Sequence, residues 1–237
     1  FLDFSKFPPD SNFTDDSVMT VATMDCLLRN GDFAKYYQNY GRKYPYRGYG
    51  TQFQKWLDAD NPAPYNSFGN GSAMRVSPIG IAGQSLEEVL DMAKQSAQVS
   101  HNHPEGIKGA QAIASAVFLA KQRKSKEEIK QFIEENFHYN LHRSINDIRL
   151  NYHFDSSCQG SCPEAIIAFL ESKSFEDSIK LAISLGGDSD TIACMAGGIS
   201  QAYYQEIPEY MLDQLWQIVP LEMRKTLEEF SKKYPVN

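Results

Sequence analysis

Two short clusters of oxygen-bearing side chains, far apart in the chain, are the residues best suited to chemistry. The segment Thr14–Asp16 opens one apolar helical run, and the segment Asp188–Thr191 follows a glycine pair and opens another. Four carboxylates gathered at one place repel one another unless cations lie between them. If the two segments meet in the fold, they form an all-oxygen ligand set for metal ions: Thr14, Asp15, Asp16, Asp188, Asp190 and Thr191.

Carboxylate and hydroxyl oxygens favour particular ions. They suit Mg²⁺ or Mn²⁺, whereas Zn²⁺ prefers nitrogen and sulfur ligands, and neither cluster contains a His or Cys. Two ions that share carboxylates can hold a pair of substrate oxygens and a water molecule. The clusters therefore predict two divalent cations, Mg²⁺ or Mn²⁺. The simpler alternative is that the second cluster is an ordinary capped helix start, because Asp and Ser are favoured N-caps.

Two further segments, Gly69–Arg75 and His101–Glu105, carry glycine and histidine in patterns typical of binding sites. Together with Thr14–Asp16 and Gly187–Thr191, and in this order along the chain, they resemble the motifs of the ADP-ribosylglycohydrolase family. Any one of these motifs alone would be weak evidence. Four of them in the right order favour the family strongly.

The resemblance implies a metal-dependent hydrolase that releases ADP-ribose from a modified protein or small molecule, for example from an arginine side chain. It implies that Asp16 or Asp190 accepts a proton from the attacking water. Departure of the acceptor would leave an oxocarbenium-like centre at C1 of the distal ribose. The residues expected to contact the substrate are Gly69, Asn70, Gly71, Ser72, Met74 and His101.

Other functions are compatible with the same residues. A non-catalytic module could bind ADP-ribose in this cleft, or a toxin-neutralising protein could cover the surface of a toxin. A magnesium phosphohydrolase would share the metal ligands but would release AMP and ribose phosphate instead of intact ADP-ribose. The acceptor is open as well, because serine, O-acetyl and nucleobase linkages occur in the family besides arginine.

The loop over residues 60–72 is the longest stretch without helical periodicity, and such long loops are usually functional or disordered. Ser72 is expected to cap the next helix, whose N-terminus would present N–H donors to a phosphate. The alternative is a simple Asn-Gly turn. His101 and His103 are two positions apart and do not share a helix face. We therefore favour substrate contact by His101, or hydrogen bonding at a helix junction, over a zinc site.

Two other stretches could border the site. Residues 44–50 contain three tyrosines and Arg47, which either line a substrate entrance or pack against the core. Residues 144–160 are rich in polar and turn-forming types. Asp155 or Ser156 could therefore reach the substrate, and the alternative is that both belong to a plain loop.

Helical periodicity accounts for most of the chain, and no strand-type alternation, internal repeat or linker is visible. The prediction is a single compact all-α domain over residues 1–237, with many orthogonally packed helices whose starts converge on one cleft. Relatives carry an N-terminal helix before the first acidic cluster. That helix is expected to be missing here, where residues 1–13 suggest an extended lead-in. The expected helices cover residues 18–28, 33–40, 51–58, 85–99, 107–121, 165–172, 179–185, 192–202, 210–219 and 221–233, with another from Ser125.

Composition excludes some classes of function. The 237 residues carry a net charge of −7, which argues against general binding to a nucleic-acid backbone. No apolar run approaches the roughly 20 residues that span a bilayer, so no membrane association is expected. The four cysteines lack paired metal-ligand spacing and are interpreted as free thiols, which fits a cytoplasmic protein. A monomer is expected.

Overall fold

The computed structural model describes residues 11–236, and within this range the chain forms thirteen α-helices, one 3₁₀ turn and no β-strand. The prediction of an all-α fold is confirmed. Residues 1–10, most of the expected lead-in, lie outside the described range. The helices are α1 (Asp15–Arg29), α2 (Phe33–Lys43), α3 (Thr51–Asp58), α4 (Ser77–Ala82), α5 (Leu86–Gln98), α6 (Pro104–Lys121), α7 (Lys126–Phe137), α8 (Ile145–Arg149), α9 (Cys158–Glu171), α10 (Phe175–Ser184), α11 (Ser189–Tyr204), α12 (Glu209–Ile218) and α13 (Leu221–Lys233), and the 3₁₀ turn η1 is Asn70–Ser72.

Local sequence chemistry sets several helix boundaries as predicted. Helix α1 begins at the first acidic cluster and ends at Asn30, which adopts the left-handed conformation with φ 50°. Helix α3 covers the expected residues. Helix α7 begins with a complete capping box, in which Ser125 and Glu128 bond to each other's backbone N–H groups.

Several helices begin or end a few residues away from the expected limits, and two differences have a clear local cause. Helix α9 begins at Cys158, because the Ser157 side chain accepts a hydrogen bond from the Gly160 N–H, so this helix starts well before the expected range of residues 165–172. Helix α8 was not predicted and lies in a stretch expected to be a loop. Its start at Ser144 is stabilised by a second complete capping box.

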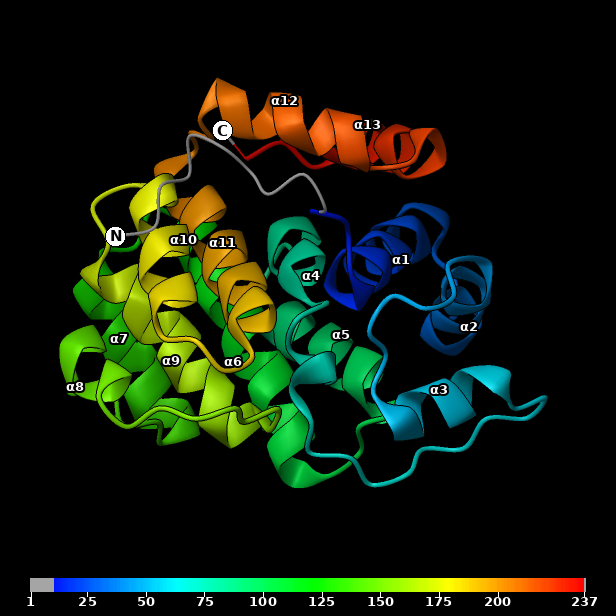
Figure 1. The fold of residues 1–237 in the computed structure, drawn as a ribbon, viewed down its shortest axis with the longest axis horizontal. Helices are drawn as coiled ribbons and strands as arrows, with labels where there is room; N and C mark the ends of the chain where they lie inside the picture. The colour runs from blue at the N-terminus through cyan, green and yellow to red at the C-terminus, as the bar shows by residue number, and fades with distance from the viewer. Residues whose placement is uncertain (1–10, 237) are drawn as a thin grey trace.

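Helix α6 lies at the centre of the fold and packs against α4, α5, α7, α9 and α11 (Figure 1). Its buried face is rich in Ala and Gly, which lets neighbouring backbones approach closely. A Cβ atom added at Gly109 would lie only 2.5 Å from Cys158 Sγ on α9. The small residues of α6 therefore set the distance between the central helix and its neighbours.

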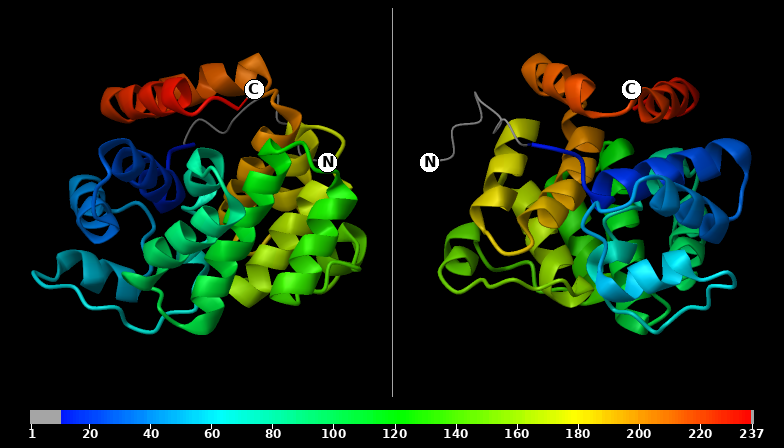
Figure 2. Two further views of the ribbon diagram at one scale, coloured as in Figure 1. Left: turned by 180° about the vertical axis from the view of Figure 1, so that it is seen from behind. Right: turned by 45° about the vertical axis from the view of Figure 1, so that its right-hand side comes forward.

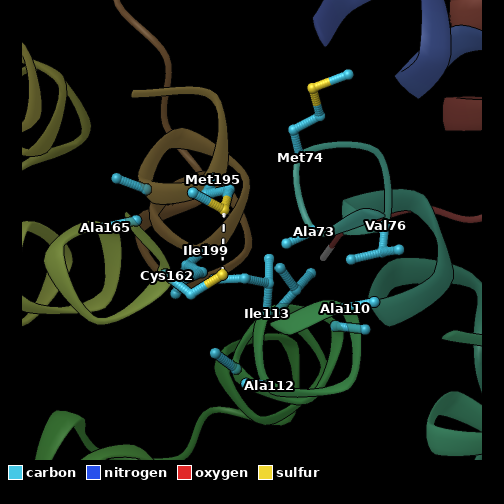
Figure 3. Packing of buried hydrophobic residues seen from close by; sticks show 14 of the residues in the cluster. Ala73, Met74, Val76, Ala110, Ala112, Ile113, Cys162, Ala165, Met195 and Ile199 are labelled. Atoms are coloured by element: carbon cyan, nitrogen blue, oxygen red, sulfur yellow. Dashed lines mark hydrogen bonds between the residues drawn. The ribbon is translucent and has the colours of Figure 1, made fainter. Parts of the chain in front are cut away.

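The centre of the core is apolar and is built by helices distant in sequence. Ile113 of α6 faces Cys162 of α9 and Met195 and Ile199 of α11 (Figure 3). The Cys162 and Met195 sulfur atoms are 3.8 Å apart. Burial of such side chains stabilises the fold by roughly 1.5–3 kcal/mol each.

Helices α1 and α11 lie near opposite ends of the chain, yet they contact each other, and both pack against α4 (Figure 1). Helices α12 and α13 cross one side of the molecule, and α13 packs on α1 (Figure 2). This arrangement brings the N-termini of α1 and α11 to one region. None of the helices between residues 11 and 236 has the length and apolar character to cross a membrane.

Candidate active site

The structure brings the two acidic clusters together, although they are 175 positions apart in sequence. Asp16 lies in the first turn of α1, and Thr191 lies in the first turn of α11. The Thr191 hydroxyl donates to Asp16 Oδ2 at 3.4 Å, and the Thr14 hydroxyl donates to the same oxygen at 3.0 Å. The two helix starts therefore meet through one carboxylate.

A glycine pair delivers the chain to the start of α11. Gly186 and Gly187 have φ values of +71° and +62°, in the left-handed region that strains residues with a Cβ atom. A Cβ at Gly187 would also lie 2.7 Å from the Tyr152 ring. These two positions require glycine for the turn that places Asp188 and Asp190.

Neither of these helix starts is capped in the ordinary way. Thr14 and Asp188 occupy the N-cap positions of α1 and α11, but neither side chain accepts a hydrogen bond from a backbone N–H group of its own helix. Asp188 Oδ2 instead accepts from the Asn70 side-chain amide at 2.8 Å. The alternative that the second cluster is an ordinary capped helix start is therefore wrong.

The gathered carboxylates perturb one another. Burial, and then the negative charges of Asp190 and Asp188, raise the pKa of Asp15 to about 6. Burial, and then the charges of Asp15 and Asp190, raise the pKa of Asp16 to about 7. Burial also raises the pKa of Asp188, against the lowering effect of its hydrogen bond from Asn70. This corner carries more negative charge than its surroundings neutralise.

The donor set fits divalent cations. Asp16 Oδ1 is buried and has no hydrogen-bond partner in the described chain, which is costly for a carboxylate oxygen unless a cation satisfies it. Between residues 11 and 236, no group of three or more His, Cys, Asp or Glu side chains is already drawn together as a metal site. The two threonine hydroxyls supply the remaining predicted oxygen ligands.

A cavity of about 790 Å³ opens beside the two helix starts. This volume lies in the range of small-molecule sites. Asp16 and Ser72 do not border the cavity, and both are buried behind its wall. The predicted site residues that line it are Thr14, Asp15, Gly69, Asn70, Gly71, Met74, His101, Asp188, Asp190 and Thr191.

The expected role of Ser72 as a helix cap is wrong. Ser72 lies in η1, and its hydroxyl donates to the carbonyl oxygens of Gly69 at 3.2 Å and Gly106 at 2.8 Å. The next helix, α4, begins only at Ser77 and has no side-chain cap. Ser72 therefore holds the glycine turn against α6 and does not form the N-terminus of a helix.

His101 lines the cavity beside the glycine turn and is buried, with its ring 5.7 Å from Tyr65 and 6.0 Å from Phe53. Burial, and then the charge of Arg75, lower the pKa of His101 well below its usual value. His103 instead caps α6, where Nδ1 accepts from the Glu105 N–H. The two histidines therefore have different surroundings.

Sequence reasoning missed part of the cavity wall. Phe53, Tyr65 and Arg75 line it but carry no pattern that distinguishes them from core residues, although Arg75 directly follows Met74 in the glycine motif. For Arg47, Asp155 and Ser156, the sequence allowed either a place at the site or an ordinary structural role. All three border the cavity. Tyr46, from the same stretch as Arg47, is 96% exposed and does not.

The fold and cavity define a class of all-α proteins in which acidic and hydroxyl groups of two helix N-termini meet beside a cavity. A family model described as ADP-ribosylglycohydrolase matches residues 2–235. ADP-ribosylhydrolase ARH3 of Mus musculus is 32% identical, over 83% of this chain and 71% of the mouse protein. ARH3 of Homo sapiens is 31% identical, over 83% and 72% of the two chains. This chain belongs to the ADP-ribosylglycohydrolase family.

A solved structure supports the same fold. The structure of an ADP-ribosylglycohydrolase-related protein complex matches with a TM-score of 0.71 over 92% of this chain and 81% of that chain. Sequence identity between the two is 24%, so the match shows the fold alone.

Proposed function

We propose that this protein is a metal-dependent hydrolase that removes ADP-ribose from a modified acceptor. The observation that carries the proposal is the meeting of two acidic helix starts, through Thr191 and Asp16, at one cavity. Stabilising a helix start needs only residues of that helix, whereas here the Asp16 carboxylate accepts a hydrogen bond from a residue 175 positions away. The names of the mouse and human relatives point to the same chemistry.

The residues proposed to hold two divalent ions, Mg²⁺ or Mn²⁺, come from the two helix starts. Bound divalent ions lower the pKa of water and polarise substrate oxygens. Asp16 would be one of the ligands, because its buried Oδ1 atom has no hydrogen-bond partner in the described chain. The full proposed ligand set is Thr14, Asp15, Asp16, Asp188, Asp190 and Thr191.

Proton transfer is assigned to Asp190. Of the two candidates, Asp190 is exposed and borders the cavity, whereas Asp16 is buried behind the wall with Thr14 and Thr191 on one oxygen. A general base must lie within hydrogen-bond reach of the water it deprotonates. Asp190 is open to a water in the cavity, whereas the wall separates Asp16 from it.

The remaining cavity residues bind and orient the substrate. Gly69 and Gly71 leave backbone close to the cavity, and the nearby Tyr65 and Phe53 rings offer apolar surface to a nucleotide. Asp15, also on the wall, stabilises positive charge that develops at C1 of the ribose as the acceptor departs. The substrate is thereby held with its sugar toward the acidic residues.

The acceptor proposed is a protein side chain such as arginine. The four cysteines are free, which supports a place for the protein in a reducing compartment such as the cytoplasm. We propose that it acts there as a monomer on ADP-ribosylated proteins or small molecules.

The experiment is incubation with acceptors that carry ADP-ribose on arginine, serine, O-acetyl or nucleobase groups, with and without Mg²⁺ or Mn²⁺. Release of intact ADP-ribose, only with metal, supports the proposal. AMP and ribose phosphate as products would indicate a phosphohydrolase instead. Tight ADP-ribose binding without turnover of any substrate would indicate a binding module.

A further inference from the structure

His101 is held by one hydrogen bond on one side of its ring only. Its Nδ1 atom lies 2.7 Å from the Ser100 hydroxyl. On the other side, Nε2 approaches the glycine turn, where a Cβ atom at Gly71 would lie 3.1 Å from it. Among residues 11–236, no protein group hydrogen-bonds to Nε2. His101 lines the cavity, and its Nε2 atom is the ring nitrogen without a protein partner.

The Ser100 hydroxyl can donate only one hydrogen, and its surroundings decide where that hydrogen goes. Arg75 Nη2 donates to Ser100 Oγ at 3.1 Å, so the oxygen acts as an acceptor toward Arg75. Within the described chain, His101 Nδ1 is the acceptor available to the hydroxyl hydrogen. The opposite arrangement, with Nδ1 protonated, would leave a buried O–H without a partner, which costs free energy.

Arg75 is fixed and permanently charged. Its side chain is 0% exposed, Nη2 also donates to the Ser96 carbonyl at 2.6 Å, and the guanidinium stacks on the Tyr37 ring at 4.1 Å. A guanidinium does not lose its proton in proteins. Arg75 is therefore always the hydrogen-bond donor toward Ser100, and the Ser100 oxygen is always the acceptor.

The same surroundings keep the imidazole neutral. Phe53 of α3, which packs near the His101 ring, is apolar. Burial raises the pKa of Tyr65 to about 12, so Tyr65 is uncharged. Arg75 is positive and lies over the Phe53 ring. Burial, and then the Arg75 charge, lower the pKa of His101 itself. A neutral ring that accepts at Nδ1 carries its hydrogen on Nε2.

We propose that Arg75, acting through Ser100, fixes His101 as the neutral tautomer with hydrogen on Nε2, so that His101 donates a hydrogen bond to an oxygen of the bound ligand. Arg75 and Ser100 are positioning residues, and His101 is the ligand-binding residue. The choice of tautomer stands on the protein alone. The choice of ligand, an oxygen of ADP-ribose, rests on the proposed function.

The tautomer is tested by two-bond ¹H–¹⁵N correlation spectra of protein labelled at histidine nitrogen. We expect His101 to show a protonated Nε2 and an unprotonated Nδ1, unchanged over about pH 5 to 8, in which an unperturbed histidine titrates. Ser100→Ala should give a mixture of tautomers, and Ser100→Thr, which keeps the hydroxyl, should not. A protonated Nδ1 in the wild-type protein, or titration of the ring in this range, overturns the proposal.

The ligand contact is tested by isothermal titration calorimetry with ADP-ribose on two variants that replace the imidazole of His101. Because neither variant has an imidazole, the tautomer set by Ser100 does not affect the result. The amide of His101→Gln reaches the place of Nε2, whereas that of His101→Asn reaches only the place of Nδ1. We expect near wild-type affinity for the first and roughly 2- to 12-fold weaker binding for the second, the value of one neutral hydrogen bond. Melting temperatures confirm that both variants fold.

The results separate the two proposals. Equal affinity of the two variants, or weaker binding by His101→Gln, overturns the donor role of Nε2. Failure of the wild-type protein to bind ADP-ribose contradicts the proposed function, while the spectra still decide the tautomer.

Discussion

Helix starts in this protein use the same residue types in two opposite ways. At α2, α7 and α10, the side chains of Asp32, Ser125 and Ser174 accept hydrogen bonds from N–H groups of their own first turns. At α1 and α11, Thr14 and Asp188 occupy the same position but form no such bond. The Thr14 hydroxyl instead donates to the Asp16 side chain, and Asp188 accepts a hydrogen bond from the distant Asn70.

The difference separates stability from function. A side-chain cap typically contributes about 1 kcal/mol to stability. The starts of α1 and α11 at the cavity lack this contribution. They also gather carboxylates whose pKa values are raised by burial and by one another. The capped starts of α2, α7 and α10 should therefore matter for melting temperature, and the starts of α1 and α11 should matter for turnover.

The largest expected effect is the loss of turnover in Asp16→Asn and Asp188→Asn. Each variant removes a proposed ligand charge, so ADP-ribose release should fall by about 100-fold or more. Stability without metal should be unchanged or higher, because repulsion decreases. The matched control is Asp32→Asn, since Asn also caps helices and Asp32 lies outside the cavity wall. Retained turnover in either variant would contradict the proposed mechanism.

A smaller loss is expected from Asn70→Ala, which removes the hydrogen bond to Asp188 Oδ2. Partners that orient metal ligands typically affect metal affinity by about 10- to 100-fold. The Mg²⁺ or Mn²⁺ concentration for half-maximal turnover should rise accordingly. Asn136→Ala, on the exposed side of α7, serves as the control. An unchanged metal dependence in Asn70→Ala would show that this bond does not orient a ligand.

Metal should stabilise the wild-type protein. At 100 times its dissociation constant, a single bound ion contributes about 2.7 kcal/mol, which corresponds to a rise in Tm of roughly 5–10 °C for a chain of this size. Differential scanning fluorimetry with Mg²⁺, Mn²⁺ or a chelator measures the shift. The shift should disappear in Asp16→Asn. An equal shift in that variant would place the ion elsewhere.

The stability of the metal-free protein should depend on pH in a definite direction. The pKa values of Asp15 and Asp16, about 6 and about 7 when folded, exceed the ordinary value of 3.8. The folded state then binds more protons, so these groups favour folding most below about pH 4 and progressively less as pH rises through 6 and 7. Denaturant unfolding of wild type and Asp16→Asn should show their difference growing between these limits. A constant difference would contradict the raised pKa values.

The smallest effect on activity is expected at an ordinary cap. Ser174→Ala removes the hydrogen bond to the Asp177 N–H and should cost about 1 kcal/mol of stability. Turnover should not change, because Ser174 does not border the cavity. Thr14→Ala should show the reverse pattern, with little loss of stability from capping and lower turnover. Similar profiles for the two variants would remove the distinction between the two kinds of helix start.

Much of the fold could be predicted because helix periodicity and capping are local. The limits of α3 and the capping box at Ser125 follow from neighbouring residues. The start of α9 does not, because Ser157 and Ser161 are both good caps. The backbone of Cys158 bonds to the Phe68 carbonyl, and that tertiary contact favours the earlier start.

The candidate site was only partly predictable for a related reason. Polar clusters such as those at Asp16 and Asp190 stand out in a sequence. Aromatic and cationic wall residues such as Tyr65 and Arg75 resemble core or surface residues until the cavity exists. The role of Ser72 was misjudged because its bond to the Gly106 carbonyl spans 34 positions.

The sequence by itself determined an all-α chain with acidic and hydroxyl groups at two helix starts. Only the tertiary structure decided that Asp188 and Asp16 accept hydrogen bonds from distant segments of the chain. A local cap and a distant hydrogen bond have similar free energies, about 1 kcal/mol each. The partners that decide between them, Asn70 for Asp188 and Thr191 for Asp16, lie 118 and 175 positions away. Packing of α1, α4 and α11 brings these partners within hydrogen-bond distance. This packing cannot be predicted from the residues next to each helix start.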